Sequence, residues 1–488
     1  MAGLQFYSGG RLHTFRGSTL GALERRRASS TRMGPMAAAA AASVPAIVDS
    51  FNAQSKRMES RFQSLHESEL RLMPTRTEAD TGLVTAMVPT ETVILEEVAR
   101  TELAWLKSEF GMEVVAEGRE GKVLLRAPES GEAAIETAFE AARACFERGN
   151  VAAAHPNFLR LMRRPQASSA GTETPWHLDN PGNPGVFGAD VHALAAWTIT
   201  KGDSSIRVAI LDEGVDTEHS RLKPAVVAEK DFVDGNDHAR PDGDDAHGTA
   251  CAGIVCSRDS KVSGLAPNVS LVAARIAKGD GNGFWIFDDF ETADAIDWCW
   301  EDAGADVLSN SWGGGPEVDA ITRAFERART QGRDGKGAVV VVAAGNSESP
   351  VFYPGTLSGV LTVGASNQWD ERKTKTSQDG EGWWGSNHGS SLDLVAPGVR
   401  IATTDIRGSH GYSSTMFTDT FNGTSSATPM VAACAALILS IRPDLTEGEV
   451  RDVITSTADP LAPSGKRNNF VGHGRLNCYA ALRAARRR

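Results

Sequence analysis

Ala338-Val339-Val340-Val341-Val342 is an uninterrupted run of strand-forming apolar residues, and it decides the fold class of this chain. A strand that is apolar on both sides is buried on both faces, which is typical of a parallel sheet covered by helices. Upstream of this run, strand patterns alternate with helical patterns. The predicted strands are 207–211, 270–276, 305–309 and 338–343, and the predicted helices are 247–257, 290–303 and 318–330. We therefore expect an α/β fold with a doubly wound, mostly parallel sheet and helices on both faces.

A different pattern precedes this region. The predicted elements are a strand at 83–88, a helix with Leu95, Val98, Leu103 and Leu106 on one face, strands at 112–116 and 122–126, a helix at 133–148 and a strand at 151–161. The order β-α-β-β-α-β is the ferredoxin-like α+β arrangement. A polar, turn-rich stretch follows it and predicts an exposed connector open to proteolysis. We expect a small domain at 81–164, a connector at 165–175 and a large domain at 176–488.

Residues 1–80 carry no chemistry that we can assign. The first part is rich in Arg and Ser, contains Glu24 as its one acid up to Ile47, and ends in an alanine run behind Arg25-Arg26-Arg27. This composition is compatible with a transit-like or twin-arginine export segment and equally with a disordered basic tail. A linker or surface helix is expected after it. Because no convincing secretory signal is present, we favour a cytoplasmic location over an exported or organellar one.

The composition excludes several classes of partner. The chain has 488 residues and a net charge of -12, which argues against nucleic acid or an anionic membrane as a general partner. No run of about eighteen strongly apolar residues occurs, so we expect no membrane span. The six cysteines are scattered without metal-site spacing, and we expect buried free thiols at Cys251, Cys256 and Cys434.

Three motifs carry candidate catalytic residues. Asp212 follows the strand 207–211, at the end where parallel sheets place their sites. His247 begins a helix of very small residues, and Ser425 lies at the start of an apolar helix behind Gly423, where the helix dipole favours developing negative charge. Taken singly, His247 is more often a structural histidine and Ser425 more often a helix cap, and Asp212 has the alternative of a turn aspartate. Together they are the set that activates a serine hydroxyl at neutral pH.

The order Asp212, His247, Ser425 is that of subtilisin. From about Trp176 to Ala484 the chain resembles the subtilase family of subtilisin-like serine proteases, through the motifs 212–216, 247–249 and 423–429. Other stretches are similar to the kexin-like branch, although the chain ends without room for that branch's usual C-terminal domain. The resemblance implies the Asp212, His247 and Ser425 triad, and it implies that the ferredoxin-like segment is an inhibitory prodomain.

The resemblance also suggests how substrate is held. It implies that Asn346, in the motif Ala343-Ala344-Gly345-Asn346, donates its side-chain amide to the oxyanion. It implies that Ser311, Trp312 and Gly313 lie on an edge that pairs with an extended peptide. Without the triad, Asn346 would be interpreted as a turn residue that follows glycine.

Acidic residues near the triad suggest a specificity. Glu213 follows Asp212 directly and Asp244 precedes His247 by three positions, so we hypothesise that both stand on the rim and receive a basic substrate residue. Solvated loop charge is the alternative. Calcium is a habit of the family, and the stretches 231–237 and 242–245 offer oxygen ligands without matching a defined calcium loop, so its ligands stay unassigned.

We therefore expect a serine endopeptidase made as a zymogen, which acts on protein or peptide substrates and requires no organic cofactor. Two alternatives stay open: a pseudoenzyme that uses the same groove to bind peptides, and a subtilase that joins or cyclises peptides.

Overall fold

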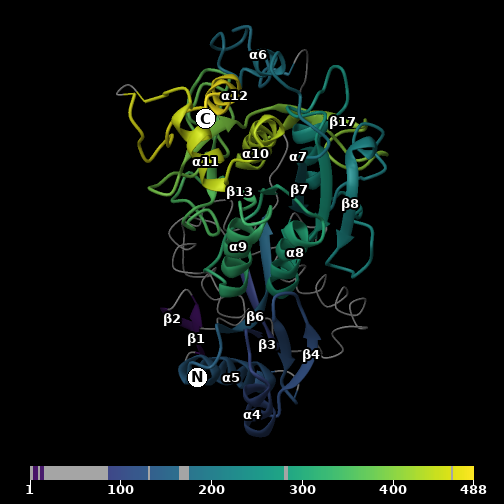
Figure 1. Ribbon diagram of the computed structural model, residues 1–488, viewed down its shortest axis with the longest axis vertical. Helices are drawn as coiled ribbons and strands as arrows, with labels where there is room; N and C mark the ends of the chain where they lie inside the picture. The colour runs from purple at the N-terminus through teal and green to yellow at the C-terminus, as the bar shows by residue number, and fades with distance from the viewer. Residues whose placement is uncertain are drawn as a thin grey trace, which may run out of the picture. The chain divides into compact units, whose positions relative to one another are not determined.

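The computed structural model describes residues 4–8, 11–15, 86–129, 132–163, 175–279, 284–462 and 465–488. The chain forms two units, which can be followed by residue colour in Figure 1. The first unit consists of Met1–Arg164, Gly279–Asp297 and Gly315–Ala324, and the second unit consists of Pro165–Lys278, Trp298–Gly314 and Phe325–Arg488. Two short segments from within 176–488 therefore group with the first unit.

The first unit contains an antiparallel sheet with elements in the order β-α-β-β-α-β. These are β3 (Ala86–Glu96), α4 (Arg100–Phe110), β4 (Glu113–Glu117), β5 (Val123–Arg126), α5 (Glu132–Arg148) and β6 (Ala153–Arg163). The sheet order is β10-β11-β6-β3-β5-β4, in which β10 (Lys278–Gly279) and β11 (Phe284–Asp288) extend the β6 edge. An apolar core between α4, α5 and the strands holds the unit together. The predicted ferredoxin-like topology is confirmed.

The first strand is longer than predicted, because β3 continues to Glu96. Leu95, which we predicted on a helix face, is a buried strand residue, and Val98 precedes the helix. The polar residues after Val88 obscured the strand pattern. Two of them are satisfied inside the sheet, since Thr90 donates its hydroxyl to the carbonyl of Asn157 (2.9 Å) and its Oγ1 lies 2.7 Å from that of Thr92.

A hairpin that we did not predict lies within the N-terminal stretch. It consists of β1 (Leu4–Ser8) and β2 (Arg11–Phe15). Phe6 is buried, and its ring centroid lies 5.7 Å from that of Phe139 and 5.4 Å from that of Phe158. The hairpin therefore adds to the core of the first unit. The expected helix before residue 80 lies outside the described residues, as does the connector apart from Pro175.

The second unit is built on a seven-stranded sheet in the order β15-β14-β13-β12-β7-β9-β8. All neighbouring pairs are parallel, as predicted. The strands are β7 (Arg207–Asp212), β8 (Val226–Asp231), β9 (Ser270–Arg275), β12 (Val307–Asn310), β13 (Val339–Ala343), β14 (Leu361–Ser366) and β15 (Leu394–Pro397). Every residue of β13 is buried, because helices cover the sheet.

Five helices of the described residues lie wholly in the second unit. They are α6 (Ala193–Trp197), α7 (His247–Cys256), α10 (Thr424–Ile441), α11 (Glu447–Ser456) and α12 (Cys478–Ala485), with a 3₁₀ turn at Lys223–Ala225. Two further helices, α8 (Asp289–Glu301) and α9 (Asp319–Gln331), begin in the first unit and end in the second. Strands β16 (Ile401–Thr404) and β17 (Phe417–Phe421) form a separate antiparallel pair. Helices α7 and α10 pack against each other and against β7.

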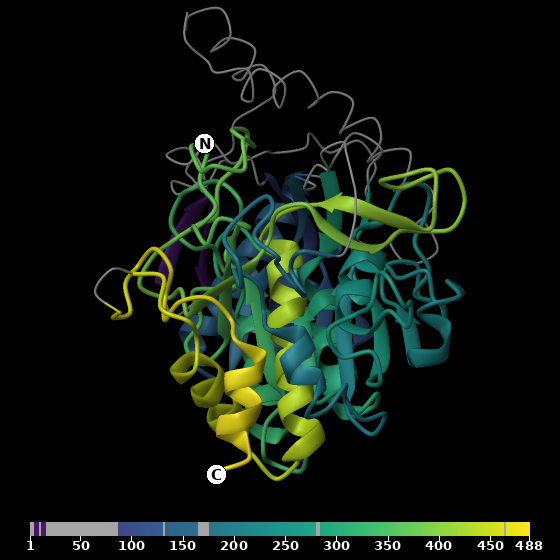
Figure 2. The same ribbon diagram turned by 90° about the horizontal axis from the view of Figure 1, so that it is seen from above.

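Helix α10 is the central helix of the second unit, and Figure 2 shows it in yellow-green in front of the sheet. It packs against β12, β13, β14 and β15. Among the residues that the structure describes, it is the one helix long and apolar enough to cross a membrane, and 89% of it is buried inside the second unit. Packing in the core therefore accounts for its apolar composition.

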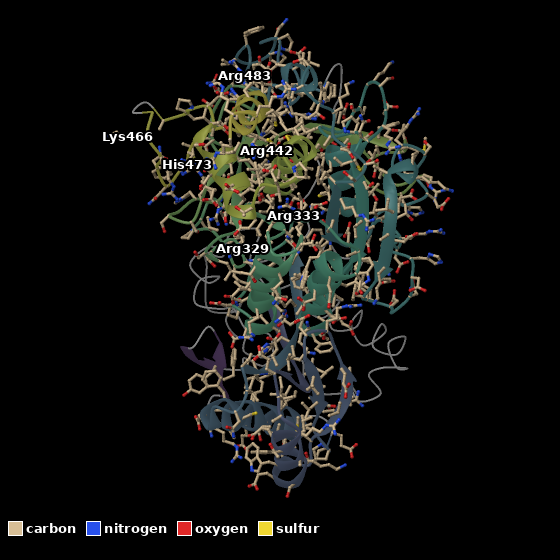
Figure 3. All side chains as sticks on the ribbon, viewed as in Figure 1. Arg329, Arg333, Arg442, Lys466, His473 and Arg483 are labelled. Atoms are coloured by element: carbon tan, nitrogen blue, oxygen red, sulfur yellow. The ribbon has the colours of Figure 1, made fainter. Side chains whose placement is uncertain are left out.

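Two arginines labelled in Figure 3 tie the helix ends of the second unit together. Arg329, near the end of α9, pairs with Glu447 at the start of α11 (2.8 Å). Arg333 donates to the carbonyl oxygens of Pro443 (2.9 Å) and Leu445 (3.0 Å). These bonds fix the loop that leads out of α10.

Candidate active site

Asp212 and His247 form a buried hydrogen-bonded pair at the carboxyl edge of the parallel sheet. Asp212 is the last residue of β7, and His247 is the first residue of α7. His247 Nδ1 lies 2.9 Å from Asp212 Oδ1 and 3.0 Å from Oδ2. Since a carboxylate only accepts, Nδ1 carries the proton and Nε2 is the basic nitrogen of the neutral ring. The pair therefore has the geometry of a carboxylate-oriented base.

Glu213 holds the start of α7. Its Oε1 accepts a hydrogen bond from the backbone amide of His247 (2.7 Å), so a residue from the strand end serves one of the helix's unpaired donors. The residue is 1% exposed. The prediction that Glu213 stands on the rim is therefore wrong, because the carboxylate points to a main-chain donor that a linear motif does not reveal.

Ser425 lies in the first turn of α10, an 18-residue helix. Gly423, which precedes the helix, has φ 119°, a left-handed conformation that favours glycine and turns the chain sharply into the helix. Ser425 Oγ donates to the carbonyl of Ser311 (3.3 Å), while Ser311 Oγ donates to the carbonyl of Ser425 (3.0 Å). These two hydrogen bonds hold the main chain at Ser311 and at Ser425 together.

Cys251 is a site residue that we placed only among the buried thiols. It lies one turn after His247, with its Sγ 3.8 Å from His247 Nδ1 and 3.5 Å from the carbonyl oxygen of Ser425. Burial, followed by the charge of Asp212, raises the pKa of this thiol well above its usual value. A neutral thiol is a poor metal ligand and nucleophile. Cys251 therefore joins α7 to α10 by packing, and all six cysteines are buried and free.

Asn346 lies beside the serine loop, in the turn after β13. Its Oδ1 accepts from the backbone amide (2.8 Å) and the hydroxyl (3.0 Å) of Thr424, the residue before Ser425. We assign the oxygen from these donors, which leaves Nδ2 as the donating side of the amide. A Cβ on Gly423 would lie 3.2 Å from that nitrogen. The amide thus contacts the main chain that leads to Ser425.

The segment Ser311, Trp312 and Gly313 follows β12, directly beside Ser425. Trp312 is buried and stacks on Phe325, with ring centroids 6.0 Å apart and an interplanar angle of 23°. A Cβ at Gly313 would lie 2.7 Å from the carbonyl oxygen of Tyr353, so the backbone there tolerates only glycine. The segment is rigid next to the serine, which suits a main-chain recognition edge.

Asp244 differs from Glu213 in being exposed. Its side chain is 68% exposed, and its Oδ1 lies 2.9 Å from His410 Nδ1. Asp245, the next residue, is buried. Of the two acids that we predicted on the rim, Asp244 alone is exposed.

The two acidic stretches surround an arginine. Arg275, at the end of β9, is 2% exposed and pairs with Asp231 (2.9 Å), Asp234 (2.8 Å) and Asp242 (2.7 Å). Lys278 lies 3.3 Å from Asp234. The guanidinium occupies the place where a calcium ion would have to bind these carboxylates. Asp231, Asp234 and Asp242 therefore do not fit a calcium site.

An oriented histidine, a serine at a helix N-terminus and an adjoining asparagine amide are the groups that acyl transfer through a serine nucleophile requires. The model of the subtilase family matches residues 203–474. The chain belongs to this family, that of the subtilisin-like serine proteases.

Relatives agree with this assignment. The chain is 33% identical over 387 residues to a calcium-dependent protease of Nostoc sp.. This alignment covers 71% of this chain and 56% of that protein. It is also 33% identical to thermitase of Thermoactinomyces vulgaris, in an alignment that covers 60% of this chain and 93% of thermitase. Fervidolysin of Fervidobacterium pennivorans shares the fold, with a TM-score of 0.62 at 21% identity over 80% of this chain and 60% of fervidolysin. The chain spans about half the length of the calcium-dependent protease that it matches.

Proposed function

We propose that this chain is a serine endopeptidase that hydrolyses peptide bonds through an acyl-enzyme. The observation that carries the proposal is the pair of hydrogen bonds from His247 Nδ1 to Asp212, in a site that also holds Ser425 and Asn346. Family membership supports the same chemistry. The base, its orienting carboxylate, the nucleophile and an amide donor are all side chains of this chain, so no organic cofactor is needed.

Each residue has a defined step. Ser425 Oγ attacks the peptide carbonyl while His247 Nε2 takes its proton and then returns it to the leaving amine. Asp212 keeps the proton on Nδ1 and stabilises the imidazolium. The backbone amide of Ser425 and Nδ2 of Asn346 donate to the oxyanion, and water releases the acyl group through the same base.

A fluorophosphonate probe tests this function. We expect the wild type to be labelled at Ser425 and to cleave an unstructured protein substrate, and Ser425→Ala to do neither. Ser440→Ala is the control, because Ser440 lies near the far end of α10 with its hydroxyl bonded to the carbonyl of Ala436. A wild type that binds peptides without labelling would be a binding protein, and joined peptides in the product mass spectrum would indicate a ligase or cyclase.

We further propose that residues 81–164, the N-terminal part of the first unit, are an inhibitory prodomain of a zymogen. Strand β6 pairs with β11, and β11 belongs to residues 203–474, the part matched by the family model. The polar, turn-rich sequence between 161 and 176 predicts a connector in which self-cleavage would occur. We expect the wild type to convert to a shorter chain while Ser425→Ala stays uncut. An intact mass of 51.8 kDa for fully active wild type would contradict this maturation.

Calcium enters the proposal through the relatives named calcium-dependent proteases. A structural calcium would need ligands other than Asp231, Asp234 and Asp242, and these stay unassigned. Activity and unfolding temperature measured with and without a calcium chelator decide the point.

A further inference from the structure

The turn that carries Asn346 is held by a second segment of the second unit. The Asn346 turn, residues 344–350, runs parallel to residues 385–388 through bridges between Ser347 and Gly385 and between Pro350 and His388. The amide of Glu348 donates to the carbonyl of Gly385 (2.8 Å). The main chain of the turn is therefore paired directly after the asparagine.

Asn387 supplies the side chain of this pairing. Its Nδ2 donates to the carbonyl oxygens of Ala344 (3.0 Å) and Pro350 (3.1 Å), at the two ends of the Asn346 turn. Its Oδ1 accepts from the amides of Ser347 (2.9 Å) and Ser349 (3.0 Å). The residue is fully buried. One amide group thus clamps the turn from both ends.

The Asn346 turn has space for the Asn387 amide because residue 345 is a glycine. Gly345 has φ 104°, and a Cβ there would lie 2.4 Å from Asn387 Nδ2 and 2.3 Å from the ring of Phe352. The main-chain amide of Asn387 also donates to the carbonyl of Gly345 (2.9 Å). A side chain at 345 would push Asn387 away from the turn.

Asn346 itself is fixed from two directions. Thr424 holds its side-chain oxygen, and Asn387 holds the main chain before and after it. An oxyanion donor contributes most when it is already oriented before the reaction, and a displacement of about 1 Å can cost about a hundredfold in rate.

We propose that Asn387 is a positioning residue for oxyanion stabilisation, acting through Asn346 and without touching the substrate. This inference rests on the proposed function. It predicts that Asn387 matters for kcat only while Asn346 is present to be positioned.

A double-mutant cycle on the full-length chain tests the coupling. We expect Asn387→Ala to lower kcat about ten- to a hundredfold with KM changed less than about twofold. Asn346→Ala and the double variant Asn346→Ala/Asn387→Ala should have equal kcat within about twofold, because the clamp then has nothing to orient. All rates are measured well below each variant's unfolding temperature.

Asn367→Ala is the matched control. Asn367 is also a fully buried asparagine of the segment before Asn387, but its Nδ2 bonds to Glu371 and Asp379, outside the Asn346 turn. We expect it to lower stability and leave kcat unchanged. If Asn387→Ala does not fold, Asn387→Asp replaces it: the isosteric side chain loses both donors to the turn, and we expect at least the same loss of kcat.

The outcomes distinguish failure of the proposed function from failure of the inference about Asn387. A wild type that neither labels nor cleaves overturns the proposed function and this inference with it. An active wild type with unchanged kcat in the folded Asn387 variants, or losses that multiply in the double variant, overturns this inference alone.

Discussion

The two large sheets of this chain use polar residues in opposite ways. In the antiparallel sheet of the first unit, charged side chains are buried within the sheet, as Arg160 of β6 pairs with Asp289 (2.5 Å). In the parallel sheet of the second unit, β13 is wholly apolar and the polar groups stand at the carboxyl ends, as with Asp212 of β7. Because parallel strands end at one edge, this sheet gathers reactive groups, whereas the first sheet uses its charges for packing and pairing. The comparison predicts that changes in the first sheet alter stability and changes at the edge alter turnover.

The largest expected effect is at the edge. Asp212→Asn should lower kcat about 10⁴-fold with the fold retained, because an amide stabilises the wrong tautomer of His247. The measurement is steady-state turnover of a peptide substrate, with circular dichroism as the folding control. A loss that came from unfolding would break the comparison.

Next is the buried pair of the first sheet. Arg160→Met in the uncut Ser425→Ala chain should lower the stability of the first unit by about 3–5 kcal/mol, since it leaves Asp289 buried without its partner. Arg143→Met is the matched control, because Arg143 pairs with Glu147 at the surface of the same unit, and it should cost less than about 1 kcal/mol. Urea unfolding followed by hydrogen exchange measures both, and equal costs would contradict the contrast between the buried and the exposed pair.

Asn346→Ala, at the carboxyl edge of the parallel sheet, should have a smaller effect. We expect kcat to fall by about 10² to 10³ with little change in substrate affinity, as for loss of one oxyanion donor. A change confined to KM would make Asn346 a ground-state contact, and it would weaken the division between the two sheets.

The smallest effect concerns pH and the second unit. Burial lowers the pKa of His177 to about 3, so the unfolded state binds a proton that the folded state does not as pH falls below 6.5. Stability from this residue is present above pH 6.5 and is lost on acidification, by about 1 kcal/mol between pH 6.5 and 5.5. His177→Leu should flatten that part of the stability profile, and His238→Leu, at an exposed histidine, should not. Parallel profiles would exclude His177 as the cause.

Much of this molecule could be predicted from sequence, for a physical reason. The parallel sheet was indicated by runs such as Val339 to Val342, and the ends of β7 and the starts of α7 and α10 could be placed because strand and helix signals are local. The predictions that were wrong concerned residues whose hydrogen-bond partners lie far away in the sequence. The burial of Glu213 follows from the main-chain amide of His247, and β3 was cut short because its threonines are satisfied by β6. Asn387 has no motif at all, since its partners are backbone atoms about forty residues away.

Arg275 has a consequence for how the acidic loop is assembled. A bound ion stabilises a protein by mass action, so its contribution depends on the free concentration of that ion and vanishes on dialysis. A guanidinium carried on β9 reaches Asp231, Asp234 and Asp242 as part of the same chain. Closure of this loop is therefore a unimolecular event with a fixed stoichiometry, and no divalent cation is needed to link these three carboxylates.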